Sequence, residues 1–186
     1  MGCCPHGTVK TSTTKEPIVT DQSSTPGKPL RVIEICAGAG GQSLGLHLAG
    51  FQHQLAIELD DNAAATLSHN LDRILKDTGE GWQVAVGDVA AIPAPGEDFN
   101  PEVHTWNPDN PAYEGVDLIA GGVPCPPFSI AGKQLGSSDE RDLFAWAVEL
   151  VDRMRPRAVL LENVRGLSMP RFAGYRQWVN DRLEEM

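Results

Sequence analysis

The sequence predicts an α/β fold built on a doubly wound, mainly parallel sheet, and two patterns carry this prediction. Five short apolar segments alternate along the chain with segments of helical spacing, which is typical of βαβ units. A glycine-rich turn, Ala37-Gly38-Ala39-Gly40-Gly41, joins the first strand to the first helix, as in nucleotide-binding folds.

The composition indicates one globular domain preceded by a tail. The chain has 186 residues, of which 41% are hydrophobic, enough for one sizeable core. Residues 1–29 are rich in Ser, Thr, Pro and Lys, so we expect a disordered tail followed by a domain over residues 30–186. No apolar run is long enough for a membrane span, and the first thirty residues lack the apolar segment of a signal peptide. A net charge of −10 argues against a stand-alone nucleic-acid binder.

The four cysteines, Cys3, Cys4, Cys36 and Cys125, do not form a disulfide framework. Their arrangement favours a reducing, cytoplasmic setting. Cys3, Cys4 and His6 could bind a metal, but a second ligand pair at finger spacing is missing, so we interpret them as part of a solvated tail and predict no metal site.

The first predicted strand is Arg31–Ile35, and the glycine turn leads from it into a helix over Gln42–Ala49 that Gly50 ends. Glycines let the backbone approach a ligand closely, and a helix N-terminus favours negative charge. The apolar positions expected to face the core are Leu44, Leu46 and Leu48.

The next strand, Gln54–Glu58, ends in an acid about twenty residues after Gly38, where a ribose-binding carboxylate belongs. A structural turn with a coincidental Glu58 is the alternative. Asp61 or Asn62 can cap a helix that runs to about Leu75. Its apolar stripe is Ala64, Leu67, Leu71 and Ile74.

A short strand, Gln83–Val86, is followed by Gly87-Asp88. Asp88 could accept a hydrogen bond from an adenine amino group, although an Asp there is about as often a turn residue. The stretch Ile92–Gly115 has no periodicity and reads as a long loop without an assignable role.

The segment Asp117–Ser129, DLIAGGVPCPPFS, begins as a buried strand and then breaks at two glycines. It sets Cys125 among Pro124, Pro126 and Pro127, just past the strand end, where ligands bind in open parallel sheets. A thiol held on such a loop is predicted to be a nucleophile rather than a core side chain.

A helix is predicted over Leu143–Met154, then a buried strand Ala158–Glu162 and a final helix Phe172–Glu185. The helix has an apolar face at Phe144, Ala147, Val148 and Val151. An acid that ends an apolar strand, as Glu162 does, is costly to desolvate without a partner or a function. A strand order of 3-2-1-4-5 would place Glu162 and Cys125 after neighbouring strands, at the same carboxyl end of the sheet as the glycine turn.

The segments EICAGAGGQSLGL, IELD, GDV, GGVPCPPFS, DERDLF and ENV occur in this order, and together they resemble the DNA cytosine-5 methyltransferases from about Arg31 to the C-terminus. The resemblance implies a Rossmann-like methyltransferase sheet and S-adenosylmethionine as cofactor. It also implies DNA as substrate, with the target cytosine flipped out of the duplex. By position, the implied catalytic residues are Cys125 as nucleophile and Glu162 as acid, and the implied cofactor residues are Gly38, Gly40, Gly41, Glu58 (ribose), Asp88 (adenine amino group), Pro124 and Leu143.

Three positions depart from the family pattern. Cys36 stands where the family often has Phe, and Leu59 replaces a common Trp, so adenine packing is expected to differ. Pro126 stands where Gln is usual after the catalytic Cys, which affects DNA contacts more than the chemistry.

The chain stops at Met186, before the family's arginine-bearing motif, target recognition domain and late segments. We therefore expect a fragment or subunit that needs a second chain or a missing C-terminal half, with Ala158–Glu162 left as an uncovered sheet edge. The resemblance implies a bacterial restriction–modification role. The alternatives are a catalytically incomplete nucleotide-binding relic or regulatory module, and a dinucleotide-dependent oxidoreductase, which leaves the Cys-Pro loop and Glu162-Asn163 unexplained.

Overall fold

The computed structural model describes residues 28–74, 81–124 and 142–186. Almost all of the predicted tail, including Cys3, Cys4 and His6, lies outside the described residues, as do Cys125 and Pro126.

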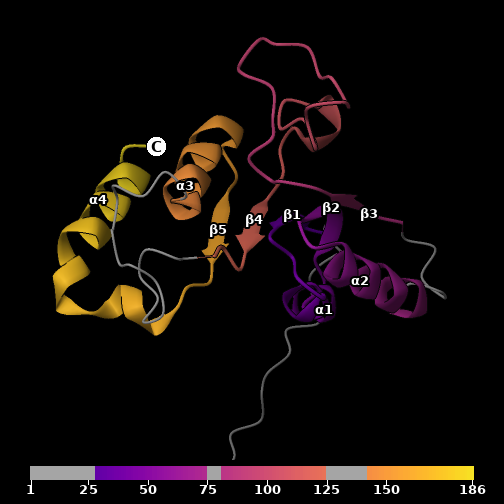
Figure 1. The fold of residues 1–186 in the computed structure, drawn as a ribbon, viewed down its shortest axis with the longest axis horizontal. Coiled ribbons are helices and arrows are strands. Elements are labelled where there is room, and N and C mark those ends of the chain that lie inside the picture. The colour runs from indigo at the N-terminus through magenta and orange to yellow at the C-terminus, as the bar shows by residue number, and fades with distance from the viewer. Residues whose placement is uncertain (1–27, 75–80, 125–141) are drawn as a thin grey trace, which may run out of the picture.

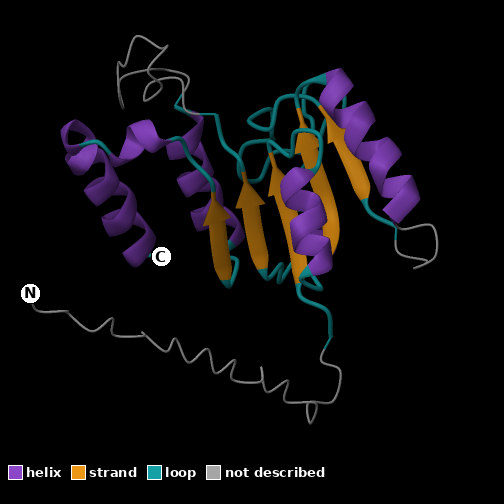
Figure 2. Cartoon of the chain, turned by 90° about the horizontal axis from the view of Figure 1, so that it is seen from below, coloured by secondary structure: helices purple, strands orange, loops and turns teal. Residues whose placement is uncertain are grey.

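A five-stranded parallel sheet forms the centre of the molecule, and Figure 2 shows all five strands pointing the same way. The strand order β3-β2-β1-β4-β5 confirms the order expected from the sequence. The strands are β1 (Arg31–Ile35), β2 (Gln52–Glu58), β3 (Gln83–Val86), β4 (Leu118–Gly121) and β5 (Ala158–Leu161). Among the described residues, β5 pairs with β4 alone and Leu160 is 47% exposed, in keeping with a sheet that is incomplete at one edge.

Helices cover both faces of the sheet (Figure 1). They are α1 (Gly41–Leu48) and α2 (Asp61–Ile74) on one face, and α3 (Leu143–Met154), against which α4 (Ala173–Glu184) packs, on the other. Successive side chains of β1 point to opposite faces of the sheet. Val32 packs with Leu46 of α1, whereas Ile33 belongs to the cluster that contains Phe144 and Val148 of α3.

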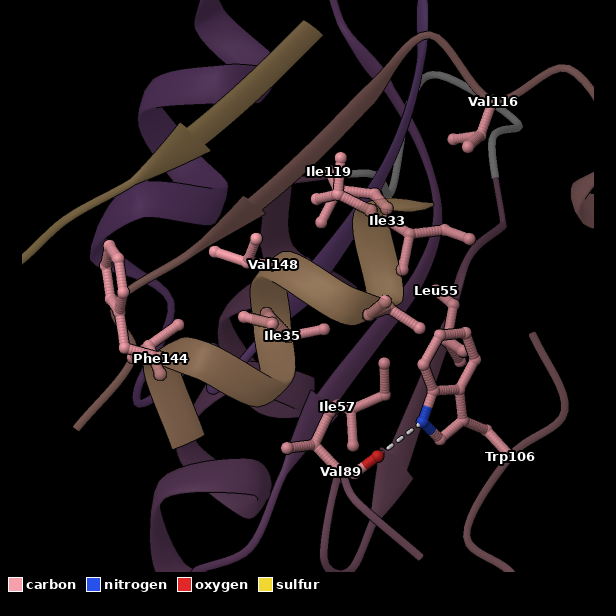
Figure 3. Close-up of a cluster of buried hydrophobic side chains, with 14 of the residues drawn as sticks. Ile33, Ile35, Leu55, Ile57, Val89, Trp106, Val116, Ile119, Phe144 and Val148 are labelled. Carbon is pink, nitrogen blue, oxygen red and sulfur yellow. Dashed lines mark hydrogen bonds between the residues drawn. The ribbon is translucent and has the colours of Figure 1, made fainter. Parts of the chain in front are cut away.

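The largest core lies between the sheet and α3, where Phe144 and Val148 meet Ile33, Ile35 and Ile119 (Figure 3). Four predicted apolar positions of α3 are buried, as expected: Phe144, Ala147, Val148 and Val151.

The loop between β3 and β4 is anchored to this core. Trp106 is buried, and its indole N–H donates to the carbonyl of Val89 over 2.9 Å (Figure 3). A short 3-10 helix, η1 (Pro111–Tyr113), lies in the same loop and is capped by the side chain of Asn110. Burial of Trp106 therefore holds the β3–β4 loop against the core, although the loop sequence shows no periodicity.

Two helix predictions are wrong in detail. Of the three leucines predicted to face the core in α1, only Leu46 is buried, at 7% exposure, while Leu44 is 41% and Leu48 is 77% exposed. A helix turns by 100° per residue, so a spacing of two places alternate leucines on opposite sides. In α2 the cap is Asp60 rather than Asp61 or Asn62, because its Oδ1 accepts the N–H of Ala63 over 2.8 Å.

A buried polar cluster lies between β1, α1 and β2, and we name it the Glu34 cluster (Glu34, Ser43 and His53). The hydroxyl of Ser43 donates to Glu34 Oε2 over 2.6 Å, and His53 Nε2 lies 3.1 Å from the same oxygen. Both partners and Glu34 are at most 3% exposed. The pairing register shifts after Val32, so that Val32 is opposite His53 while Ile33 is opposite Leu55. This bulge turns His53 toward the helix face that Glu34 occupies.

No helix within residues 28–74, 81–124 and 142–186 has the length and apolar character needed to cross a membrane.

Candidate functional site

A pocket of about 480 Å³ opens at the carboxyl ends of the strands, the end to which the arrows of Figure 2 point. Its size falls within the roughly 300–1,000 Å³ of small-molecule sites. Five residues that the sequence predicts for the cofactor, Gly38, Glu58, Asp88, Pro124 and Leu143, line it together. The other lining residues are Cys36, Ile57, Leu59, Asp60, Gly87, Val89 and Gly122.

Glu58 is held at the end of β2 by two backbone hydrogen bonds. Its Oε2 accepts the N–H of Gly38 over 2.7 Å, and its Oε1 accepts the N–H of Asp60 over 2.9 Å. Gly38 has a φ of 57°, a conformation that glycine adopts without strain. Each carboxylate oxygen has a further lone pair, so a fixed Glu58 could still accept hydrogen bonds from the hydroxyl groups of a ligand.

Asp88 follows β3, the strand next to β2, and the backbone N–H of the preceding Gly87 donates to the carbonyl of Glu58 over 2.9 Å. Asp88 Oδ1 accepts the N–H of Ala90 over 2.9 Å, and the Asp88 side chain is exposed. The preceding Gly87 has a φ of 150°, and a Cβ there would lie 2.5 Å from Thr105 Oγ1. Only glycine therefore allows the turn that places Asp88 at the pocket.

Gly40 and Gly41 belong to the same turn but are not among the lining residues. Gly40 caps α1 with a φ of 96°, and a Cβ on it would lie 2.6 Å from Leu67 Cδ1. Gly41 is the first residue of α1. Gly40 thus lets Leu67 of α2 pack against the turn.

Cys36 lies in the pocket wall with a φ of 51°, which is unusual for a residue other than glycine. Burial, followed by the charges of Glu58 and Asp88, raises the pKa of its thiol to about 12. A thiol that stays protonated is a poor nucleophile. Cys36 therefore contributes packing to the pocket, which Leu59 also lines.

Glu162 follows β5, and its backbone N–H donates to the carbonyl of Gly121 over 2.8 Å. Its carboxylate reaches the pocket rim, because a Cβ built on Gly122 would lie 3.5 Å from Glu162 Oε2. The side chain is exposed, so the desolvation cost expected from the sequence does not arise. Pro124 also lines the pocket, and the next residue, Cys125, lies outside the described residues.

Asp60 is a pocket residue to which the sequence patterns assign no role. It caps α2, and its backbone N–H holds Glu58. The signal that could have identified it is the Asp-Asp-Asn run before the helix, where the first residue, rather than the second or third, occupies the cap position.

Comparison with known proteins gives one consistent result. The family described as C-5 cytosine-specific DNA methylase matches residues 30–186. The chain is 61% identical over 157 residues to the Type II methyltransferase M.NaeI of Lentzea aerocolonigenes, covering 84% of this chain and 33% of the relative. It is 45% identical over 154 residues to the Type II methyltransferase M.NgoMIV of Neisseria gonorrhoeae, covering 83% and 42%.

A crystal structure described as a DNA modification methyltransferase encoded within a prophage of E. coli superposes with a TM-score of 0.58 at 27% identity. It covers 84% of this chain and 38% of its own. The chain therefore spans between about a third and two fifths of the length of these relatives.

Proposed function

The chain belongs to the C-5 cytosine-specific DNA methylase family, and on this basis we propose that it carries the S-adenosylmethionine site and the methyl-transfer residues of a DNA cytosine-5 methyltransferase. The observation that carries the proposal is the pocket at the carboxyl ends of the strands, where Gly38, Glu58 and Asp88 meet. In this proposal residues 30–186 form the partial catalytic domain, and residues 1–29 are a tail outside it.

The pocket fits the chemistry of an adenosyl group. Glu58, fixed by Gly38 and Asp60, offers oxygens for two ribose hydroxyls, and Asp88 offers an acceptor for the adenine amino group. Apolar walls suit the faces of a purine ring, and they come from Ile57, Leu59, Val89, Pro124 and Leu143. When bound, S-adenosylmethionine supplies an electrophilic methyl group.

The proposed roles of Cys125 and Glu162 follow from the chemistry of cytosine. Carbon 5 is a poor nucleophile, and addition of the Cys125 thiolate to carbon 6 raises the electron density on carbon 5. Glu162 would bind ring nitrogen 3 and the amino group and so stabilise the adduct. After carbon 5 is methylated, its proton leaves to a base and the thiolate of Cys125 is eliminated, which restores the aromatic ring.

DNA recognition is proposed to require residues beyond those of this chain. The aligned part of this chain covers only 33% and 42% of two relatives, and the flipped cytosine must be presented by a second half, on the same or another chain. The second candidate function is that of a catalytically incomplete nucleotide-binding module. Its supporting observation is that the chain matches only part of the length of its relatives.

Calorimetric titration with S-adenosylmethionine, with NAD as control ligand, tests the cofactor site. We expect binding of S-adenosylmethionine alone. Glu58→Ala should weaken it by about 10- to 100-fold, because a charged hydrogen-bond acceptor contributes about 1.5–3 kcal/mol. Glu102→Ala, which removes an exposed acid of the β3–β4 loop, is the matched control and should leave affinity unchanged. Binding of NAD in place of S-adenosylmethionine would refute the proposal.

Transfer of a labelled methyl group to DNA tests the catalytic residues. Cys125→Ala should abolish transfer in an assembly that contains the second half. Unchanged transfer in this variant would refute the role of Cys125. Methylation of DNA by this chain alone would refute the requirement for a second half, and an inactive but cofactor-binding assembly would favour the non-catalytic module.

A further inference from the structure

The segment that follows Glu162 has a charge opposite to that of the chain as a whole. Residues 163–180 contain three arginines and no acidic residue, whereas the net charge of the chain is −10. The segment runs through two short 3-10 helices, η4 (Arg165–Ser168) and η5 (Pro170–Phe172), into α4. In Figure 2 the part between β5 and α4 lies at the end of the sheet to which the strands point, which is also the end of the pocket.

Two of the three arginines, Arg165 and Arg171, point outward, and we name them the basic strip. Both are exposed, and neither forms an ion pair within residues 28–74, 81–124 and 142–186. The guanidinium of Arg171 lies 4.9 Å from the ring centroid of Phe172 and donates to Met169 Sδ, so it is partly ordered. Neither contact neutralises its charge.

Arg176 has a different function in the same segment. It is partly buried and donates to the carbonyls of Leu167 and Met169 over 2.6 and 2.9 Å. These bonds tie the two short helices to α4. The backbone that carries the basic strip is therefore held in place.

Several other arginines of the described residues form ion pairs with acidic side chains. Arg153 pairs with Asp109, Arg157 with Asp117, and Arg182 with Glu149 and Asp152. The acid that approaches α4 near the strip, Asp142, accepts the hydroxyl of Tyr175 on both oxygens and caps α3. Among the residues that the structure describes, the basic strip thus stands out as positive charge without an acidic partner, in a chain whose net charge is −10.

We propose that Arg165 and Arg171 contact backbone phosphates of duplex DNA beside the target cytosine. The proposal rests on the proposed function, because it assigns to the strip the task of placing the duplex against Glu162. An exposed guanidinium without an acidic partner can bind a phosphate through two parallel hydrogen bonds. Such contacts fix the register of a protein on DNA and carry no sequence information. The strip would act before, and independently of, the recognition of a particular sequence.

Fluorescence anisotropy of a labelled duplex of about two helical turns, titrated with the full chain between about 50 and 200 mM salt, tests the proposal. The slope of log K against log salt should fall by about one for Arg165→Gln and about two for Arg165→Gln/Arg171→Gln. The loss should be equal for two duplexes of unrelated sequence. Arg73→Gln/Arg157→Gln removes the same charge from α2 and from the start of β5, and it should leave the slope unchanged.

Nuclear magnetic resonance of the arginine side chains tests the same contacts when the affinity for DNA is too low for anisotropy. The Nε–Hε signals of Arg165 and Arg171 should shift on addition of duplex, and those of Arg73 and Arg157 should not. Absence of any shift at low salt, or an equal loss of slope in the control variant, would overturn the proposal. Binding of S-adenosylmethionine is measured separately. If the chain binds S-adenosylmethionine but substitution of the strip changes neither the salt slope nor the arginine signals, this inference is refuted and the proposed function stands.

Discussion

Removal of the Ser43 hydroxyl should destabilise the fold, although the substitution is small and lies within a helix. The hydroxyl donates over 2.6 Å to Glu34, a side chain with no exposed surface whose Oε1 has no hydrogen-bond partner among the described residues. A hydrogen bond to a charged group contributes about 1.5–3 kcal/mol, and its loss leaves a buried carboxylate with His53 as its remaining partner. Alanine is the better helix former by about 0.5 kcal/mol, which works against the loss.

We therefore expect Ser43→Ala to lower the free energy of unfolding by about 1–2.5 kcal/mol. For a chain of this size the melting temperature should fall by about 2–10 °C. Circular dichroism during thermal and urea unfolding measures both quantities. The matched control is Ser168→Ala, which removes an exposed hydroxyl that donates to the carbonyl of Arg165 over 2.7 Å and should cost less than about 0.5 kcal/mol.

A double-mutant cycle with Glu34→Gln isolates the pair. Coupling between Ser43 and Glu34 should account for most of the loss. Equal stability of the Ser43→Ala and Ser168→Ala variants would refute the reasoning, because the buried and the exposed hydroxyl would then contribute alike.

Further predictions concern three residues, Gly121, Cys36 and Asp117. Gly121→Ala should lower the free energy of unfolding in urea by about 1–3 kcal/mol, because the added Cβ would lie 2.5 Å from Ile35 Cγ1 and 2.7 Å from the Ile35 carbonyl oxygen. In the control variant Gly45→Ala the added Cβ has no atom within 4 Å, so this variant should be as stable as the parent or more stable. The Cys36 thiol, whose pKa is raised to about 12, should resist alkylation in the native protein and react on unfolding, as peptide mass mapping would show; alkylation at the unfolded rate would contradict this. Because this pKa lies above the ordinary value of 9.0, Cys36 should also cost stability as pH rises above 9.0, and Cys36→Ala should flatten that decline. A backbone N–H and an arginine side chain lower the pKa of Asp117, so the stability that its carboxylate contributes should be present at neutral pH and lost as pH falls through the lowered pKa. Asp117→Asn should therefore weaken the dependence of the melting temperature on acid pH. An unchanged dependence would contradict this prediction.

The order of motifs along the chain is enough to predict the sheet and to bring five of the proposed cofactor residues to one pocket. Alternating strands and helices require parallel neighbours with crossover helices, and the carboxyl ends of such strands meet at one edge. Glu58 and Asp88 could therefore be assigned to one site from their positions at the end of β2 and just after β3, and the structure places both in one pocket.

The features that depend on contacts between distant segments could not be predicted in this way. The bulge that brings His53 to Glu34 is a matter of register between β1 and β2, and a period of two along one strand does not reveal it. The partners of Glu58 and the raised pKa of Cys36 arise from groups that only the folded sheet brings together. Local periodicity and turn chemistry act over a few residues and so can be read along the chain, whereas burial and charge act across space and exist only once the strands have assembled.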